Sequence, residues 1–257
     1  MKRFLFIFCI SSLILLANDE KIQESLNNNN NLTQEEILYE SRKYDPLSGY
    51  NRAMTQFNYG FYSYVTKPIA KGYAYVMPAP ARVGIDNFFT NLLFPVRFVN
   101  NLLQLKFKNA SKELGRFLIN TIWGFGGFMD QATHTVGMDI YRENFGSTLA
   151  YWGVGEGVHI VLPFFGPSNL RDAFGSIFDV VLSPTQYTGH NTIPYKIPQK
   201  IDHGYAIATT YSVNLVSFDP DSLDKLSERR VDLYEVLKYY YNQKRDEELR
   251  KTFETGE

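Results

Sequence analysis

ARVGIDNFFTNLLFPVRFVNNLLQL, residues 81–105, is the stretch that decides the fold. On a helical wheel its polar side chains fall within one arc of roughly 100°: Arg82, Asp86, Thr90, Arg97, Asn100, Asn101 and Gln104. Surface helices of soluble proteins usually have a wider polar face, whereas a transmembrane span needs ~20 mostly apolar residues. The narrow polar stripe therefore predicts a helix in a protein core, or one in lipid whose stripe faces water or a channel.

The composition gives no support to nucleic-acid binding and suits a protein at a boundary between apolar and aqueous surroundings. The 257 residues have a net charge of −1, which gives no support to nucleic-acid binding. Aromatic residues make up 16% of the chain, with 20 Phe, 18 Tyr and only 2 Trp. Such side chains suit boundaries that are apolar at one end and wet at the other. A soluble protein with a large aromatic core would show the same excess.

The N-terminus has the pattern of a secretory signal peptide over residues 1–17. Lys2 and Arg3 precede an apolar stretch that ends near the small residue Ala17. Cleavage would remove these two positive charges and no acid, which takes the net charge from −1 to −3. An uncleaved anchor is the alternative. Cys9, the single cysteine, lies inside the apolar stretch, so no lipobox is recognisable and acylation stays open.

Three further segments are expected after the signal. Residues 18–32 are polar and rich in Asn, so they cannot bury enough apolar surface to fold and are interpreted as a tether. Residues 33–215 are interpreted as one helical, membrane-embedded domain, opening on the capping-box pair Thr33 and Glu36 with a short helix to Lys43. Residues 216–257 are expected to form a charged C-terminal helix that packs on this domain or extends from it.

Proline and capping residues predict the helix boundaries in the first half of the domain. Asp45-Pro46 is expected to open a helix that ends at Lys67-Pro68, followed by a short helix before Met77. Pro95 is expected to kink or split the helix of residues 81–105. Asn109 or Ser111 is expected to cap the next helix, which runs to Thr121.

The second half alternates glycine-rich segments with helices. Glycine density over residues 145–170 favours turns and close backbone approach. Helices are expected over residues 169–182 and 201–215, and Asp219-Pro220 is expected to start one long helix to about Phe253. Because no run of residues alternates as a strand would, the predicted fold class is mostly α.

No set of catalytic or metal-binding residues emerges. Gly166-Pro167-Ser168-Asn169-Leu170 is the nearest match to a nucleophile elbow, but it lacks the second glycine, and Ser168 is interpreted as a helix N-cap. The four histidines are widely spaced and form no zinc motif, so neither a metal nor another cofactor is expected. The mixed charges near the C-terminus are typical of a solvated helix face, with a partner surface as the alternative.

Four collinear blocks carry a resemblance to a known family. They are residues 45–58 (DPLSGYNRAMTQFN), 78–104 (PAPARVGIDNFFTNLLFPVRFVNNLLQ), 116–132 (RFLINTIWGFGGFMDQA) and 145–175 (FGSTLAYWGVGEG to LPFFGPSNLRDAFG), which together cover about half of the chain. In these blocks the chain resembles the VacJ/MlaA outer-membrane lipoproteins of the lipid-asymmetry pathway.

The resemblance implies a fold, a place and partners. The fold would be a ring-like bundle of amphipathic helices in one leaflet of the outer membrane, on its periplasmic side, with a central amphipathic channel. The function would be non-enzymatic phospholipid translocation, in which mislocalised phospholipids leave the outer leaflet and pass to a periplasmic lipid carrier. Family members also associate with trimeric porins. The alternatives are a soluble periplasmic lipid-binding protein and an exported lipid hydrolase.

The resemblance suggests roles in lipid contact and gating for individual residues. Arg82 and Arg97 are candidates to pair with lipid phosphate, although Arg82 could equally pair with Asp86 one turn away. Phe57 and Asn58, at the family's Phe-Asn position, are candidates for a channel gate, with a packing role as the alternative. The complete set of channel or lipid-contact candidates is Arg82, Asp86, Phe88, Phe89, Leu92, Leu93, Arg97 and Asn101.

Overall fold

The computed structural model describes residues 45–186, 196–198, 200–228 and 232–254. Within these ranges the chain is mostly helical, which confirms the predicted fold class. The expected signal peptide, the Asn-rich tether and the short helix to Lys43 lie outside the described residues.

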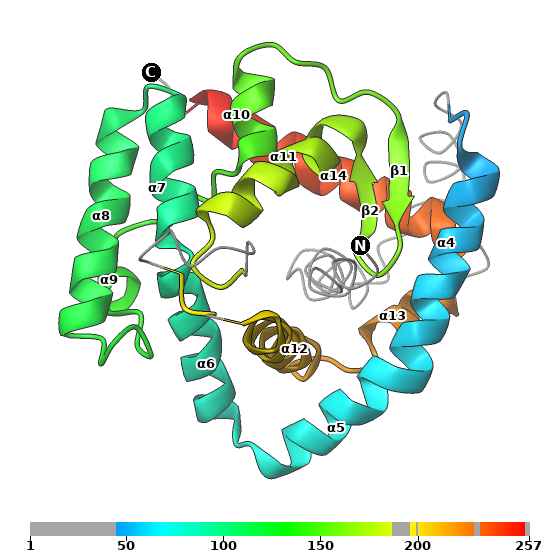
Figure 1. Cartoon of the computed structure of the whole chain (residues 1–257), viewed down its shortest axis with the longest axis horizontal. Helices are drawn as coiled ribbons and strands as arrows, with labels where there is room; N and C mark the ends of the chain where they lie inside the picture. The colour runs from blue at the N-terminus through cyan, green and yellow to red at the C-terminus, as the bar shows by residue number, and fades with distance from the viewer. Residues whose placement is uncertain (1–44, 187–195, 199, 229–231, 255–257) are drawn as a thin grey trace.

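The elements follow one another around a ring, and α12 is seen end-on within it (Figure 1). The first half of the ring consists of α4 (Ser48–Phe61), the π-helical turn η1 (Tyr62–Thr66), α5 (Lys67–Val76), α6 (Ala79–Leu92), α7 (Phe94–Leu103), α8 (Phe107–Ile122) and α9 (Gln131–His134). The second half consists of α10 (Phe145–Tyr151), β1 (His159–Leu162), β2 (Gly166–Asn169), α11 (Leu170–Leu182), α12 (Ile201–Val216), α13 (Ser222–Ser227) and α14 (Leu233–Glu254).

The helix expected to end at Lys67-Pro68 instead continues through it. A proline ring cannot donate a backbone hydrogen bond and crowds the preceding turn. The turn before Pro68 is a π-helix, in which the backbone N–H of Lys67 donates to the carbonyl of Tyr62, five residues back. This wider turn accommodates the proline. One extended rod, α4–η1–α5, therefore forms a whole side of the ring (Figure 1).

Pro95 divides the helix of residues 81–105, as predicted. α6 ends at Leu92 and α7 begins at Phe94, with Leu93 between them at ψ 7°, outside the helical region. Pro95 occupies the first turn of α7. Backbone N–H groups there have no acceptor within the helix, so the absence of an N–H on proline costs no hydrogen bond. The expected cap of the following helix was wrong, because α8 begins at Phe107, and Asn109 and Ser111 lie inside it.

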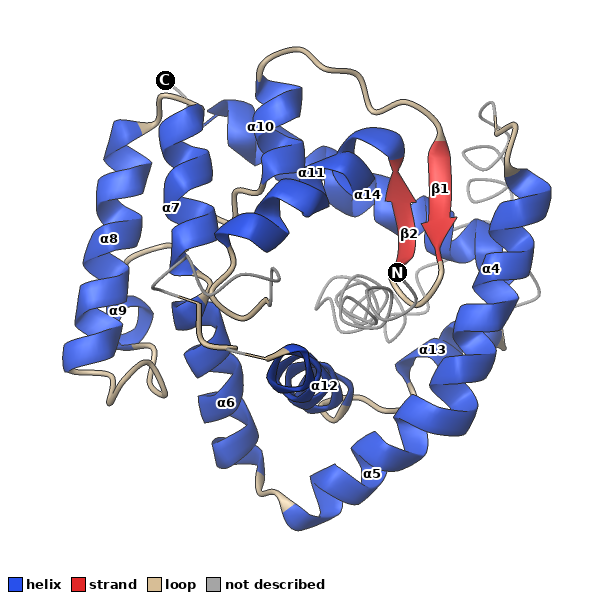
Figure 2. Cartoon of the chain, viewed as in Figure 1, coloured by secondary structure: helices blue, strands red, loops and turns tan. Residues whose placement is uncertain are grey.

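A small β-hairpin corrects the expectation that the chain has no strands. β1 and β2 pair antiparallel, with His159 opposite Asn169 and Leu162 opposite Gly166 (Figure 2). Ser168 lies in β2 and is not the N-cap of α11; that position belongs to Asn169, whose side-chain oxygen accepts the N–H of Asp172 at 2.8 Å. With only four residues in each strand, the hairpin is too short to show alternation in the sequence.

The C-terminal region contains two helices where one was expected. α13 ends at Ser227 and α14 begins at Leu233. The expectation of a solvated charged face was also wrong in part, since Lys238 and Arg245 of α14 are buried. Apolar residues of α12, α13 and α14 pack with Tyr62 and Ala70 into one hydrophobic core on the α4–α5 side of the ring.

The described residues bury many polar side chains and expose many apolar ones. The core under α7, α8, α10 and α14 is largely polar, whereas large apolar side chains are exposed on most of the helices. Across the described ranges, no helix combines the length and the apolar character needed to cross a bilayer.

Candidate functional site

The face of α6 that packs on α12 gathers three of the candidate residues. Arg82, at one end, donates to the carbonyl of Ser217 and, at 3.1 Å, to its hydroxyl, at the end of α12. Phe89, two turns further, packs its ring on Tyr211 of α12 at a centroid distance of 4.6 Å. Asp86 is four residues from Arg82 and three from Phe89, so it lies on the same face. This face, with the facing side of α12, is called here the α6–α12 face.

Asp86 has no hydrogen-bond or ion-pair partner among the described residues. The alternative of a salt bridge between Arg82 and Asp86 is not realised in this part of the chain, because Arg82 is engaged by Ser217. Burial raises the pKa of Asp86, and the positive charge of Arg142 opposes that shift. Burial likewise raises the pKa of Tyr211 to about 12, with the charge of Asp86 adding to the effect. Asp86 is therefore a desolvated acid with unused hydrogen-bonding capacity.

Arg97, the second candidate for phosphate, is occupied inside the fold. Its Nε donates to Glu113 of α8 at 2.7 Å, and its Nη1 donates to the carbonyl of Thr90 at 2.8 Å. Glu113 is fully buried and also accepts the backbone N–H of Tyr141 at 2.7 Å. Burial lowers the pKa of Arg97, and the carboxylate of Glu113 counteracts this. Arg97 thus holds α7 against α8 and the segment that follows α9.

Asn101 is fully buried on α7, three residues before Gln104, which belongs to a buried polar cluster that the sequence did not indicate. Its Nδ2 donates to the carbonyl of Arg97 at 2.9 Å. Just after α7, Gln104 donates to Glu143 at 3.0 Å, and Lys106 pairs with the same carboxylate at 3.1 Å. No spacing rule connects Glu143 to α7, since almost forty residues separate them, so nothing in the sequence could have found this pair.

The apolar candidates Phe88, Leu92 and Leu93 are half-buried at the junction of α6 and α7. Phe88 stacks on Phe128 at 5.0 Å between ring centroids and meets Phe89 edge-on at 5.8 Å. The structure therefore places these three side chains away from the charged end of the α6–α12 face.

The two gate candidates contact the hairpin. Asn58 is buried, donates to the carbonyl of Leu162 at 2.9 Å and accepts the N–H of Phe164. Phe164 has a φ of 67°, a conformation that an L-residue adopts only with support from its surroundings. Phe57 is 44% exposed, and its ring meets that of Phe164 edge-on at 5.0 Å. Asn58 therefore holds the turn of the hairpin, and Phe57 covers its outer side.

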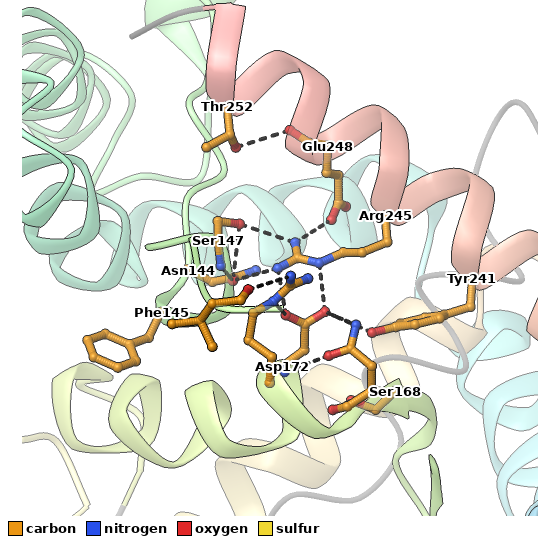
Figure 3. Close-up of polar contacts among 12 residues, drawn as sticks. Asn144, Phe145, Ser147, Ser168, Asp172, Tyr241, Arg245, Glu248 and Thr252 are labelled. Atoms are coloured by element: carbon orange, nitrogen blue, oxygen red, sulfur yellow. Dashed lines mark hydrogen bonds and ion pairs between the residues drawn. The ribbon is translucent and has the colours of Figure 1, made fainter. Parts of the chain in front are cut away.

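A second charged cluster anchors α14 across the ring (Figure 3). Arg245 of α14 donates through Nε and Nη2 to the two oxygens of Asp172, at 2.7 and 2.8 Å, and through Nη1 to Ser147 of α10 at 3.1 Å. The hydroxyl of Tyr241 donates to the same carboxylate at 2.9 Å. Burial raises the pKa of Asp172, but the charges of Arg245 and Arg171 and the hydrogen bonds from Arg245 and Tyr241 together outweigh it, so the pKa falls below its ordinary value. This cluster joins α10, α11 and α14.

Many large apolar side chains of the described residues are exposed. Among the most exposed large side chains are Tyr64, Tyr75, Val76, Ile122, Trp123 and Phe125. They come from η1, from α5, from the end of α8 and from the glycine-rich turn after it. Because a large exposed apolar area in contact with water is unfavourable, so many exposed apolar side chains indicate contact with lipid or with a partner.

The described residues offer no arrangement for metal or nucleophilic chemistry. No group of three or more His, Cys, Asp or Glu side chains in these ranges could hold a metal ion. The Ser168 hydroxyl donates to the carbonyl of Asn169 at 3.3 Å. His159 is buried beside Tyr234 and Tyr241, and burial lowers its pKa to about 4.

Comparison with known proteins gives consistent matches. A relative in Rickettsia bellii, described as uncharacterized, is 32% identical over 206 residues, covering 79% of this chain and 76% of that protein. The Escherichia coli protein named intermembrane phospholipid transport system lipoprotein MlaA is 40% identical over 139 residues, covering 52% and 55% respectively. The match to the Rickettsia prowazekii relative spans only 59% of that protein's length.

A solved structure supports the same grouping. A chain reported under the words "Structural basis for maintenance of bacterial outer membrane lipid asymmetry" superposes with a TM-score of 0.65 at 30% identity, covering 80% of this chain and all of that one. The sequence profile of the MlaA lipoprotein family matches residues 43–248. The chain therefore belongs to the MlaA lipoprotein family.

Proposed function

We propose that this protein moves phospholipids at the outer membrane as a non-enzymatic translocation channel, and that it maintains lipid asymmetry by removing mislocalised phospholipids from the outer leaflet. The observation that carries the proposal is the distribution of side chains in the ring. Apolar side chains are exposed on its helices, while Asn, Gln, Glu, Lys and Arg side chains are buried between them. Relatives named for intermembrane phospholipid transport support the same function.

The proposed mechanism places the ring in the periplasmic leaflet. Helices in lipid must satisfy their backbone groups internally, and short helices do so without crossing the bilayer. In this proposal the exposed aromatic side chains contact acyl chains, and the headgroup passes along a polar path that begins at the α6–α12 face. Arg82, Asp86 and Asn101 contribute the polar side of that path, Phe88, Phe89, Leu92 and Leu93 the apolar side, and Arg97 supports it from behind.

The hairpin and its contacts are the proposed gate. Phe57 and Asn58 lie where a rearrangement of Phe164 would move the turn between β1 and β2. The proposed partners are a soluble periplasmic carrier that receives the lipid and a trimeric porin that holds the ring in the membrane. The name of the phospholipid transport system, given to the relatives in Shigella flexneri and Escherichia coli, supports a multi-component pathway.

Leaflet analysis in a deletion strain tests the function. We expect loss of the protein to increase phospholipid in the outer leaflet and to raise sensitivity to detergents, and a plasmid copy to reverse both effects. An unchanged leaflet composition would contradict the proposal. Fractionation of the complemented strain without detergent separates the channel from a soluble periplasmic lipid-binding protein, because only the latter would be recovered mainly in the periplasmic extract.

A further inference from the structure

α11 exposes a stripe of large apolar side chains along one side. The stripe consists of Leu170, Phe174, Ile177, Phe178 and Val181, which are between 42% and 60% exposed. At about 100° per residue, these positions fall within one arc of roughly 100° on the helix. The rings of Phe174 and Phe178 meet edge-on at 5.4 Å between centroids. These side chains therefore form one apolar surface, called here the α11 stripe.

The charged side chains of α11 are turned toward the protein. Asp172 accepts hydrogen bonds from Arg245 of α14 at 2.7 and 2.8 Å. Asp179, two turns further along the helix, accepts the side-chain amide of Asn100 of α7 at 3.0 Å. Arg171 is buried. Because the two carboxylates fix the rotation of α11 against α7 and α14, the α11 stripe points away from both of these helices.

α8 has the same inverted polarity, but it lies at the outer edge of the ring. Glu113 and Arg116 are buried on one side of α8, and its exposed apolar side chains lie on the other: Phe107, Leu114, Leu118 and Ile122. The buried side packs on α7, where Glu113 accepts from Arg97. In Figure 2, α8 forms the outer edge of the ring, whereas α11 borders the interior. The apolar side of α8 therefore faces the surroundings of the ring, and the α11 stripe faces the interior.

We propose that the α11 stripe holds the acyl chains of a phospholipid in transit inside the ring. The stripe contains no polar side chain, so the occupant that complements it is uncharged and apolar. From Leu170 to Val181 it is about 16 Å long at 1.5 Å per residue, close to half of the ~30 Å hydrocarbon core of a bilayer. The acyl chains of one leaflet match the stripe in character and in length. The inference rests on the proposed function and assigns its acyl-chain contact to one helix.

Photo-cross-linking of the purified full chain identifies the occupant. The photoreactive residue p-benzoylphenylalanine replaces either Ile177 on α11 or Leu118 on α8, and each protein is incubated with phosphatidylethanolamine vesicles and then extracted into mild detergent. Detergent displaces bilayer lipid from the outer surface, whereas a lipid held inside the ring is retained. In detergent we expect at least about tenfold more phospholipid cross-linked at position 177 than at position 118, since about two buried methylene groups give that factor. Equal yields at the two positions would overturn the assignment. A cross-link from position 177 to this chain itself, or to a second copy, would also overturn it.

Charge substitutions test the same surface in cells. Ile177→Asp places on the stripe a carboxylate that an acyl chain cannot solvate, so the removal of outer-leaflet phospholipid per membrane-bound protein should slow at least about tenfold. Leu118→Asp makes the matched change on α8 and should keep the wild-type rate per membrane-bound protein. Ile177→Leu keeps the stripe apolar and should also keep that rate. Thermal unfolding of the purified variants verifies that each one is folded.

Failure of the assignment and failure of the proposed function give different results. If the wild type leaves the leaflet composition of a deletion strain unchanged, the proposed function itself fails. If the wild type removes outer-leaflet phospholipid and Ile177→Asp removes it equally fast, the assignment to α11 is wrong while the proposed function stands.

Discussion

Arg97 and Glu113 show how a charge pair can support a site without touching a ligand. Their side chains are 12% and 0% exposed, so each would be an uncompensated buried charge without the other. Arg97→Met should lower the free energy of unfolding by about 3–5 kcal/mol, measured by chemical denaturation in detergent. Arg250→Gln, which breaks the exposed pair with Glu254, should cost less than about 1 kcal/mol. Equal effects of the two substitutions would contradict a structural role for Arg97.

The buried acid Asp179 makes the stability of the fold depend on pH. Burial raises its pKa to about 6, against the hydrogen bonds it accepts from Phe145 and Asn100. The folded chain therefore holds a proton that the unfolded chain has released between pH 4 and 6. Stability from this group is present below the unfolded pKa and is lost as the pH rises through the folded value.

The test compares the wild type with Asp179→Asn, which keeps an acceptor oxygen and cannot ionise. From pH 4 to pH 7 the free energy of unfolding of the wild type should fall relative to the variant by about 2–3 kcal/mol. Denaturation curves at half-unit pH intervals measure the difference. A constant difference across this range would show that Asp179 ionises normally in the fold.

At the scale of elements, glycines decide how closely α10 and α11 approach. A Cβ on Gly175 would lie 2.5 Å from the backbone nitrogen of Gly146 and 2.9 Å from its Cα. Gly175→Ala should therefore destabilise the chain by about 1–3 kcal/mol or more through overpacking. Gly72→Ala, on α5 with no atom near the new Cβ, should instead stabilise it by about 0.5–1 kcal/mol. Thermal unfolding of both variants checks the sign of each effect.

The hairpin provides a second test of an element. Asn58→Ala removes one donor to Leu162 and one acceptor for the N–H of Phe164. We expect amide hydrogen exchange over residues 159–169 to accelerate about tenfold or more, since each buried hydrogen bond contributes about 1 kcal/mol. Asn87→Ala, which removes an exposed bond to Phe128, should leave that peptide unchanged. Unaltered exchange in Asn58→Ala would remove the basis for placing a gate there.

Local rules predicted some elements and failed at others for identifiable reasons. Pro95 acts through its own backbone chemistry, so the division into α6 and α7 followed from the sequence. Pro68 follows the same rule, yet the π turn that lets the helix continue through it left no local signal in the sequence. The α6–α12 face divided similarly: periodicity placed Arg82 and Asp86 on one polar stripe, whereas Phe89, predicted outside that stripe, meets Tyr211 only through the closure of the ring.

The described part of the molecule has an inverted distribution of polarity, with buried polar and exposed apolar side chains. Buried polar side chains join α7, α8, α10 and α14, whereas large apolar side chains are exposed on most of the helices. In water this arrangement would leave a large apolar area solvated at about 25 cal/mol per Å². In one leaflet the same area is favourable, and the buried polar clusters fix the helices relative to one another.

The two tryptophans report on this claim directly. Trp123 and Trp152 are 72% and 59% exposed, and they are the only tryptophans in the chain. The measurement is quenching of their fluorescence by brominated phospholipids in vesicles, with single-tryptophan variants Trp123→Phe and Trp152→Phe. If the ring lies in one leaflet, we expect strong quenching of both tryptophans by bromines at a depth within that leaflet, and weak quenching by iodide from the water. Strong quenching by iodide with none by the brominated lipids would contradict it.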